Sequence, residues 1–245
     1  MCVAAIAWDA HPRWRLVVAA NRDEYHERPA APLHEWPDGI IAGRDLRSGG
    51  TWLGVSAKRC VLVTNYRVPG YPLPNRPSRG GLVTALLGDA DPLRIAIADY
   101  NPFNLFCADR SGATILTNYS GMRMADTRLA VAPGVHGLSN GGYDEPWPKT
   151  VQLCGAVAKW LAGPADGVSA LFPALADATP LAATANEGPA PEPRFSSVFI
   201  RDGIYGTRCS TVLAIEHDGR GTIIERSFDA EANATGEVAI DFSWG

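Results

Sequence analysis

Short apolar runs separated by turn-forming residues dominate the first third of the chain and predict antiparallel strands. Residues 2–8 and 14–21 are apolar and partly β-branched, and residues 9–13 between them have the polar and proline composition of a turn. Residues 51–56 and 60–66 form a second pair of this kind. We therefore expect two β-hairpins in this part of the chain.

Later segments combine helical and strand patterns. Apolar residues recur at the spacing of one helix face over 150–161, and Ser78 stands where it would cap a helix over 79–87. Further helices are predicted over 92–99 and 167–176. The remaining strands are predicted over 103–108, 113–118, 128–131, 195–201, 204–216, 222–228 and 237–242.

This alternation of strands with pairs of helices is typical of a layered α+β sandwich, and we expect a single domain over residues 1–245. The segment 179–193 is rich in Ala, Pro, Thr and Glu and is predicted to be an exposed loop.

Composition removes several classes of function. The net charge is −4 and basic residues do not cluster, which argues against a nucleic-acid partner. Every apolar stretch is shorter than the roughly 20 residues of a membrane-spanning helix. The five cysteines are scattered and the N-terminus lacks the basic region of a signal peptide, so we expect a cytoplasmic protein without a disulfide framework.

The first predicted hairpin places a polar tetrapeptide beside the N-terminus. If Trp8 pairs with Arg13 or Trp14, the constant sum of antiparallel pairing puts the partner of Cys2 near 19–21, to within one or two residues. The hairpin then brings Asn21-Arg22-Asp23-Glu24 next to Cys2.

The chemistry at this corner suggests a reactive thiol. If Met1 is removed, Cys2 carries both a thiol and an α-amine, and an amine with a pKa of about 7.7–8.0 can act as a base near neutral pH. Arg22 would lower the pKa of the thiol. Asp23 would accept hydrogen bonds from the ammonium or orient Arg22. The alternative is that Cys2 is only a small apolar residue at the start of a buried strand.

A series of motifs in fixed order carries a family resemblance. They are Met1-Cys2, Asn21-Arg22-Asp23-Glu24, Arg28-Pro29, Gly43-Arg44-Asp45, Gly49-Gly50-Thr51-Trp52-Leu53-Gly54, Thr64-Asn65, Ser78-Arg79-Gly80, Ser139-Asn140-Gly141, Pro146-Trp147-Pro148-Lys149 and Tyr205-Gly206-Thr207-Arg208-Cys209-Ser210-Thr211. With these motifs the chain resembles the NRDE family, also called the transport and Golgi organisation protein 2 family.

The resemblance implies a four-layer αββα sandwich of the N-terminal-nucleophile (Ntn) hydrolase type, related to cysteine amidases that cleave non-peptide amide bonds. Cys2, Arg22 and Asp23 match the terminal cysteine, arginine and aspartate of those amidases, although in the amidases the last two are not adjacent. The late arginine of the amidases corresponds to Arg208. Eukaryotic members of the family are linked to haem and lipid handling, which supplies a non-catalytic alternative.

Two asparagines are candidate donors to a developing oxyanion. Asn65 ends an apolar strand, and Asn140 lies between Ser139 and a glycine pair; each is also a common turn residue. Arg208 by itself would more often be a solvated strand residue.

Residues 137–141 match the G-x-S-x-G nucleophile elbow, with Asp177 and His217 following in the order of a serine hydrolase. Residues 132–134 before the serine do not have the pattern of a central strand, and Pro146 and Pro148 prevent a helix after it, which argues against the elbow.

The histidines show no metal-binding spacing, and we expect neither a metal nor a resident cofactor. The sequence thus predicts a cysteine hydrolase for a non-peptide amide or ester, with Cys2, Arg22, Asp23, Asn65, Asn140 and Arg208 as site residues and a small molecule as substrate. The alternative is a binding or trafficking protein for a hydrophobic ligand such as haem or an acyl lipid. The sequence leaves the oligomeric state open.

Overall fold

The computed structural model describes residues 2–88, 90–120, 123–181 and 195–245. The chain is a mixed α+β protein with two antiparallel sheets and few helices. The sheets belong to two compact units. The first unit combines residues 1–27 and 133–242, and the second combines residues 28–132 and 243–245.

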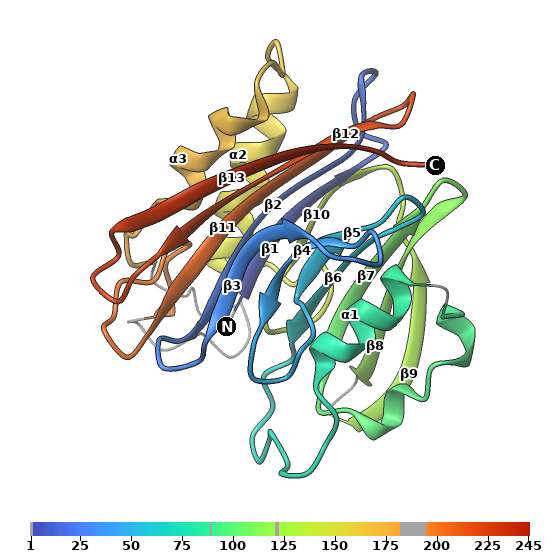
Figure 1. The fold of residues 1–245 in the computed structure, drawn as a ribbon, viewed down its shortest axis with the longest axis vertical. Helices are drawn as coiled ribbons and strands as arrows, with labels where there is room; N and C mark the ends of the chain where they lie inside the picture. The colour runs from blue at the N-terminus through green and yellow to red at the C-terminus, as the bar shows by residue number, and fades with distance from the viewer. Residues whose placement is uncertain (1, 89, 121–122, 182–194) are drawn as a thin grey trace. The chain divides into compact units, whose positions relative to one another are not determined.

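A six-stranded sheet forms the centre of the first unit, in the order β10-β1-β2-β11-β12-β13 (Figure 1). The strands are β1 (Cys2–Trp8), β2 (Trp14–Tyr25), β10 (Gly134–Leu138), β11 (Tyr205–Glu216), β12 (Arg220–Phe228) and β13 (Ala234–Ser243). All seven residues of β1 are buried, which explains why this strand is a continuous apolar run and shows no polar alternation.

One face of this sheet is covered by α2 (Pro148–Leu161), η3 (Val168–Leu171) and α3 (Phe172–Leu175), the yellow and orange helices of Figure 1. Val3, Ala5 and Ala7 of β1 pack in one core with Leu153 and Val157 of α2. Alternate strand residues therefore face these helices, while Cys2, Ala4 and Ile6 face the opposite side.

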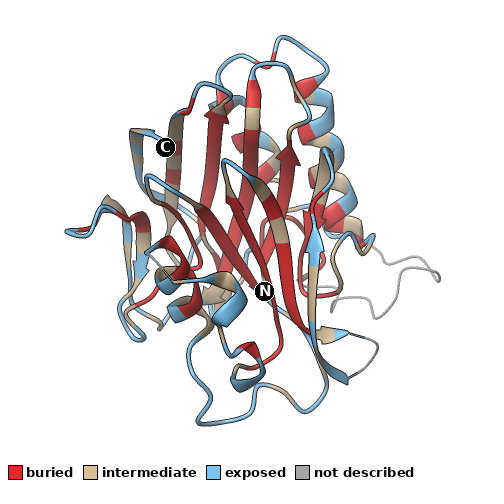
Figure 2. Ribbon diagram, turned by 90° about the vertical axis from the view of Figure 1, so that its right-hand side faces the viewer, coloured by how far each residue is buried: buried red, intermediate tan, exposed pale blue. Residues whose placement is uncertain are grey.

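The second unit contains a seven-stranded sheet in sequential order from β3 to β9. Its strands are β3 (Ala30–Glu35), β4 (Ile41–Asp45), β5 (Leu53–Val55), β6 (Cys60–Asn65), β7 (Phe103–Asp109), β8 (Gly112–Ser120) and β9 (Arg123–Ala130). The central strands β6 and β7 are almost entirely buried. Figure 2 colours the buried stretches of the chain red. Its helices are α1 (Arg79–Leu87), η1 (Pro92–Arg94) and η2 (Ile97–Asp99).

Two of the glycine motifs pack against each other in this unit. A Cβ added to Gly50 would lie 2.5 Å from the backbone carbon of Gly80, at the start of α1. The two backbones thus approach more closely than any side chain would permit.

The predicted elements agree with the structure at both hairpins, at α1 and at α2, with several corrections. Residues 92–99 form two 3₁₀ turns instead of one helix, because Ile95 and Ala96 between them are not helical. Residues 167–176 form η3 followed by the single turn α3. Strands β3, β4 and β10 were not predicted.

Residues 195–201 do not form the predicted strand, and residues 197–199 are bends. Ile200 bonds Thr207 twice: its N–H donates to Thr207 Oγ1 at 2.9 Å, and its carbonyl accepts the Thr207 N–H at 3.1 Å. Most of the predicted loop 179–193 lies outside the described residues. None of the helices in the described ranges has the length and apolar character needed to cross a membrane.

Candidate functional site

Strand β2 brings Arg22 directly opposite Cys2. The two residues are partners in the β1–β2 ladder, and on the other side of β2 Arg22 is the partner of Cys209. Side chains at paired positions lie on the same face of a sheet, so Cys2, Arg22 and Cys209 form one row across three strands. The expected placement of the tetrapeptide 21–24 beside the N-terminus is therefore confirmed.

The predicted register was one residue short of this arrangement. The β1–β2 loop is longer than the assumed turn: the N–H of Asp9 donates to the carbonyl of Arg15 at 2.8 Å, and Trp8 pairs with Leu16. The partner of Cys2 is consequently Arg22, one residue beyond 19–21 and within the predicted one or two residues of it.

Burial dominates the ionisation of the Cys2 thiol. Cys2 is 8% exposed, and desolvation raises the pKa of its thiol. The charge of Asp23 raises this pKa further, whereas a hydrogen bond from the Asp23 backbone N–H and the charge of Arg22 lower it. Arg22 thus acts in the expected direction, but burial is the larger effect and the thiol is protonated at neutral pH. Attack by this sulfur requires a nearby base.

Glu24 is the carboxylate that contacts Arg22. Residues two apart in a strand share a face, and Arg22 Nη2 lies 3.8 Å from Glu24 Oε2. Glu24 Oε1 also accepts the backbone N–H of Tyr25 at 3.0 Å. Sequence reasoning had offered this orienting role to Asp23 and missed Glu24, although strand alternation would have indicated it.

Asp23 faces the opposite side of the sheet, toward the helices. It is 3% exposed, and Thr207 Oγ1 donates a hydrogen bond to its Oδ1 at 2.7 Å. Burial raises the pKa of the Asp23 carboxyl, and the charge of Lys149 opposes this shift by lowering it. Lys149, in the first turn of α2, is fully buried. It belongs to a motif that the sequence displayed, but the sequence did not show that it lies near Asp23.

Asn21 has a structural role in this strand. Its Nδ2 donates to the carbonyls of Leu175 at 2.8 Å and Val198 at 2.9 Å, and its Oδ1 accepts the hydroxyl of Ser210 at 2.6 Å. Asn21 therefore ties the end of α3 and the bend at 195–201 to the sheet.

The loop after β10 reaches the start of β1. Ser139 Oγ donates to the carbonyl of Cys2 at 2.9 Å, and Ala4 pairs with Leu138 in the β1–β10 ladder. Because this pairing is antiparallel, continuing its register places Asn140 level with Cys2. Asn140 is buried, as an oxyanion donor in a closed site would be.

The serine-elbow alternative conflicts with this arrangement. The strand before Ser139 is β10, which stands first in the strand order and is not a central strand, as expected, and the next helix in the described residues begins only at Pro148. The ring of His217 contacts the carbonyl of His11, at the far end of β1. Seven strand residues separate the two ends by roughly 20 Å, so Ser139 and His217 do not form a catalytic pair.

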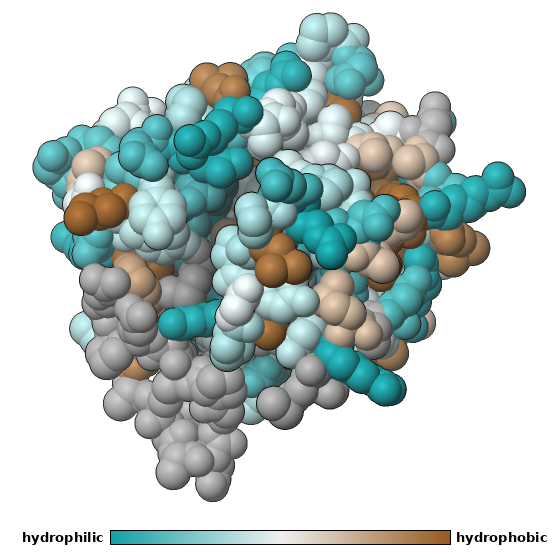
Figure 3. Space-filling model, turned by 90° about the horizontal axis from the view of Figure 1, so that it is seen from below, coloured by the Kyte–Doolittle hydropathy of each residue, from teal (hydrophilic) through white to brown (hydrophobic). Residues whose placement is uncertain are grey.

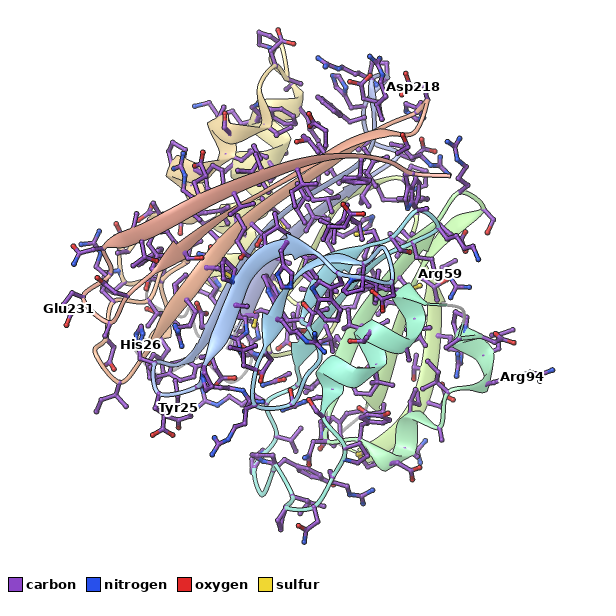
Figure 4. The ribbon with its side chains drawn as sticks, viewed as in Figure 1. Tyr25, His26, Arg59, Arg94, Asp218 and Glu231 are labelled. Carbon is purple, nitrogen blue, oxygen red and sulfur yellow. The ribbon has the colours of Figure 1, made fainter. Side chains whose placement is uncertain are left out.

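Arg208 occupies a bulge in β11, where the pairing with β2 shifts between Thr207 and Cys209. Its Nη1 donates to the carbonyls of Tyr25 at 3.0 Å and His26 at 3.2 Å, at the end of β2 marked in Figure 4. Burial lowers the pKa of Arg208, and so does the charge of Arg22. Arg208 is thus close to Arg22, as a site residue would be.

Asn65 ends β6 in the second unit, where it pairs with Phe103 and is exposed. Its role in the site stays a prediction. Among the described residues, no group of three or more His, Cys, Asp or Glu side chains could hold a metal ion.

Comparison with known proteins shows the family of the chain. A family model described as Transport and Golgi organisation 2 matches residues 1–230. The chain belongs to this family. It is 32% identical to a Transport and Golgi organization protein 2 homolog of Bos taurus and 33% identical to that of Homo sapiens, in each case over 93% of both chains. A Transport and Golgi organization 2 homolog of Mus musculus is 31% identical over the same shares.

Proposed function

We propose that this member of the Transport and Golgi organisation 2 family is an Ntn cysteine hydrolase that cleaves a non-peptide amide or ester bond. The proposal includes a single αββα domain with four layers. The observation that carries it is the pairing of Cys2 with Arg22 at the strand end that Ser139 and Asn140 also reach. These contacts unite the two ends of the chain's first hairpin with a loop more than a hundred residues away.

The reaction would begin once Met1 is removed. The α-amine of Cys2 takes the proton of the thiol, and the sulfur attacks the carbonyl carbon of the substrate. The Nδ2 group of Asn140 donates to the resulting oxyanion, and the charges of Arg22 and Arg208 favour it. As the intermediate collapses, the ammonium returns its proton to the leaving amine or alcohol. Water then attacks the thioester, assisted by the same amine, and releases the acid.

The raised pKa of the thiol is consistent with this scheme. A thiol that is protonated at rest depends on a base at the moment of attack, and an amine with a pKa of about 7.7–8.0 is a suitable one. Asn65 is a second proposed oxyanion donor.

One observation favours a second candidate, a binding or trafficking protein for a hydrophobic ligand such as haem or an acyl lipid. Cys2 is buried at the start of an apolar strand, as a purely structural cysteine would be, and the relatives are named for transport. On the face drawn in Figure 3, apolar residues form separate spots among polar ones. The described residues of this face therefore offer no continuous apolar surface to such a ligand.

Processing and substitution distinguish the two candidates. A hydrolase requires a chain that begins at Cys2, which intact-mass measurement on protein from its own host would detect. In the processed chain, Cys2→Ser keeps the terminal amine but replaces the thiol by a poorer nucleophile. Turnover of an ester or amide found by screening should then fall by orders of magnitude, with little change in ligand affinity. Full turnover in Cys2→Ser, or a native chain that uniformly keeps Met1, would contradict the hydrolase.

A further inference from the structure

Lys149 is fully buried, and burying the charge of a lysine costs free energy of folding. Its side chain is fully enclosed, and it lies in the first turn of α2, at the end of the helix where the macrodipole is positive. An ammonium taken out of water is stable only beside an anion. A nearby carboxylate would offset this cost.

Asp23 is a buried carboxylate on the face of the sheet that α2 covers. Asn21, two residues earlier in β2, binds the carbonyl of Leu175 in α3, so this row of β2 side chains faces the helices. Asp23 shares the row, is 3% exposed, and accepts the hydroxyl of Thr207 at 2.7 Å. The charge of Lys149 lowers the pKa of the Asp23 carboxyl, against the effect of burial.

We propose that Lys149 is a positioning residue: it keeps the buried carboxylate of Asp23 ionised, and the ionised Asp23 holds the α-amine of processed Cys2 in place. The second half rests on the proposed hydrolase. Asp23 follows Arg22, the ladder partner of Cys2, and its backbone N–H bonds the Cys2 sulfur. An anionic carboxylate here accepts an N–H of the amine, which leaves the amine lone pair available for the thiol proton.

The ionisation of Asp23 can be measured directly. The experiment is a ¹³C NMR titration of its carboxyl carbon in the full chain, assigned with Asp23→Asn. In Lys149→Met the titration midpoint should rise by about one pH unit or more, because an opposite charge has been removed. Lys149→Arg should restore the wild-type midpoint. Lys159→Met removes an exposed lysine from the same helix and should change nothing. A midpoint in Lys149→Met equal to that of the wild type would overturn the proposal.

Reactivity of Cys2 supplies a second readout that a purely structural role would not move. The charge of Asp23 raises the pKa of the Cys2 thiol, so Asp23→Asn should shift the pH midpoint of Cys2 alkylation downward. Lys149→Met leaves Asp23 ionised in the alkaline range where this thiol titrates, so it should not give that downward shift. An Asp23→Asn midpoint equal to that of the wild type would contradict an ionised Asp23 beside Cys2, and with it the proposal.

Folding and hydrolysis are kept separate in this design. If Lys149→Met does not fold, the double variant Lys149→Met/Asp23→Asn should fold, because it removes both members of the buried pair. A double variant no more stable than Lys149→Met would contradict the pairing. None of these measurements needs a substrate. A chain that never hydrolyses anything would refute the proposed function and leave the Lys149–Asp23 result standing.

Discussion

The hydroxyl of Ser139 donates a hydrogen bond to the backbone carbonyl of Cys2 at 2.9 Å. A serine that matches the nucleophile elbow in sequence thus supports the strand that carries the candidate thiol. Both groups are buried, so the bond fixes the position of the Cys2 backbone relative to the loop that contains Asn140. The sequence makes both residues candidate nucleophiles, whereas in the structure the Ser139 side chain holds the backbone of Cys2.

Ser139→Ala should therefore preserve most of the activity of processed protein. We expect the free energy of unfolding to fall by about 1–3 kcal/mol, because the carbonyl of Cys2 loses its buried donor. Turnover should decrease less than in Cys2→Ala, since the thiol and the amine remain. Urea unfolding and a turnover assay on both variants test this. Complete loss of turnover in a folded Ser139→Ala protein would restore the serine-hydrolase alternative.

Asn21→Ala tests the structural role of the first residue in the motif of residues 21–24. The substitution leaves three buried groups without their partner, the carbonyls of Leu175 and Val198 and the hydroxyl of Ser210. Unfolding free energy should fall by at least about 2 kcal/mol. Ser210→Ala, which removes one bond of the three, is the matched control and should cost about 1 kcal/mol. Equal losses in the two variants would contradict this role.

Local pairing was the part of the site that could be predicted from the sequence. A five-residue polar segment between two apolar runs favours a hairpin, and a hairpin brings its outer ends together whatever the loop conformation. The exact register depends on that conformation, here on the bond from Asp9 to Arg15, which is not visible in the residue pattern. This is why the partner of Cys2 was predicted one residue away from Arg22.

Contacts between elements distant in the sequence could not be predicted from the pattern of residues. Lys149 was visible as part of a motif, but only the packing of α2 on the sheet places it near Asp23. Strand β3 was missed for a different reason. Pro32 interrupts it, and half of its residues are exposed, so it lacks the apolar run that identifies β1.

Gly50→Ala tests the close approach of two glycine motifs in the second unit. The new methyl group would lie 2.5 Å from the backbone carbon of Gly80, and backbone cannot move aside as a flexible side chain can. We expect a loss of about 1–3 kcal/mol or more in unfolding free energy. Gly81→Ala, at the neighbouring helical position, meets no atom within 4 Å and should stabilise the protein by about 0.5–1 kcal/mol. Thermal or urea unfolding of both variants measures these changes. A Gly50→Ala protein as stable as the wild type would show that the two backbones do not pack this closely.

The pH dependence of Cys2 alkylation tests the electrostatics of the row that Cys2 shares with Arg22. Only the thiolate reacts, and burial raises the pKa of the Cys2 thiol, so the rate of alkylation by iodoacetamide should keep rising as pH increases above neutral. Arg22 lowers this pKa. Arg22→Ala should therefore raise the pKa further, slow alkylation at neutral pH and move the midpoint upward, whereas Arg22→Lys keeps the charge and should move it less. Cys154, whose pKa burial raises to about 12, serves as the internal reference in the same digest and should not respond to Arg22. A Cys2 rate that is unchanged in Arg22→Ala, or a change that Cys154 shares, would show that Arg22 does not tune this thiol.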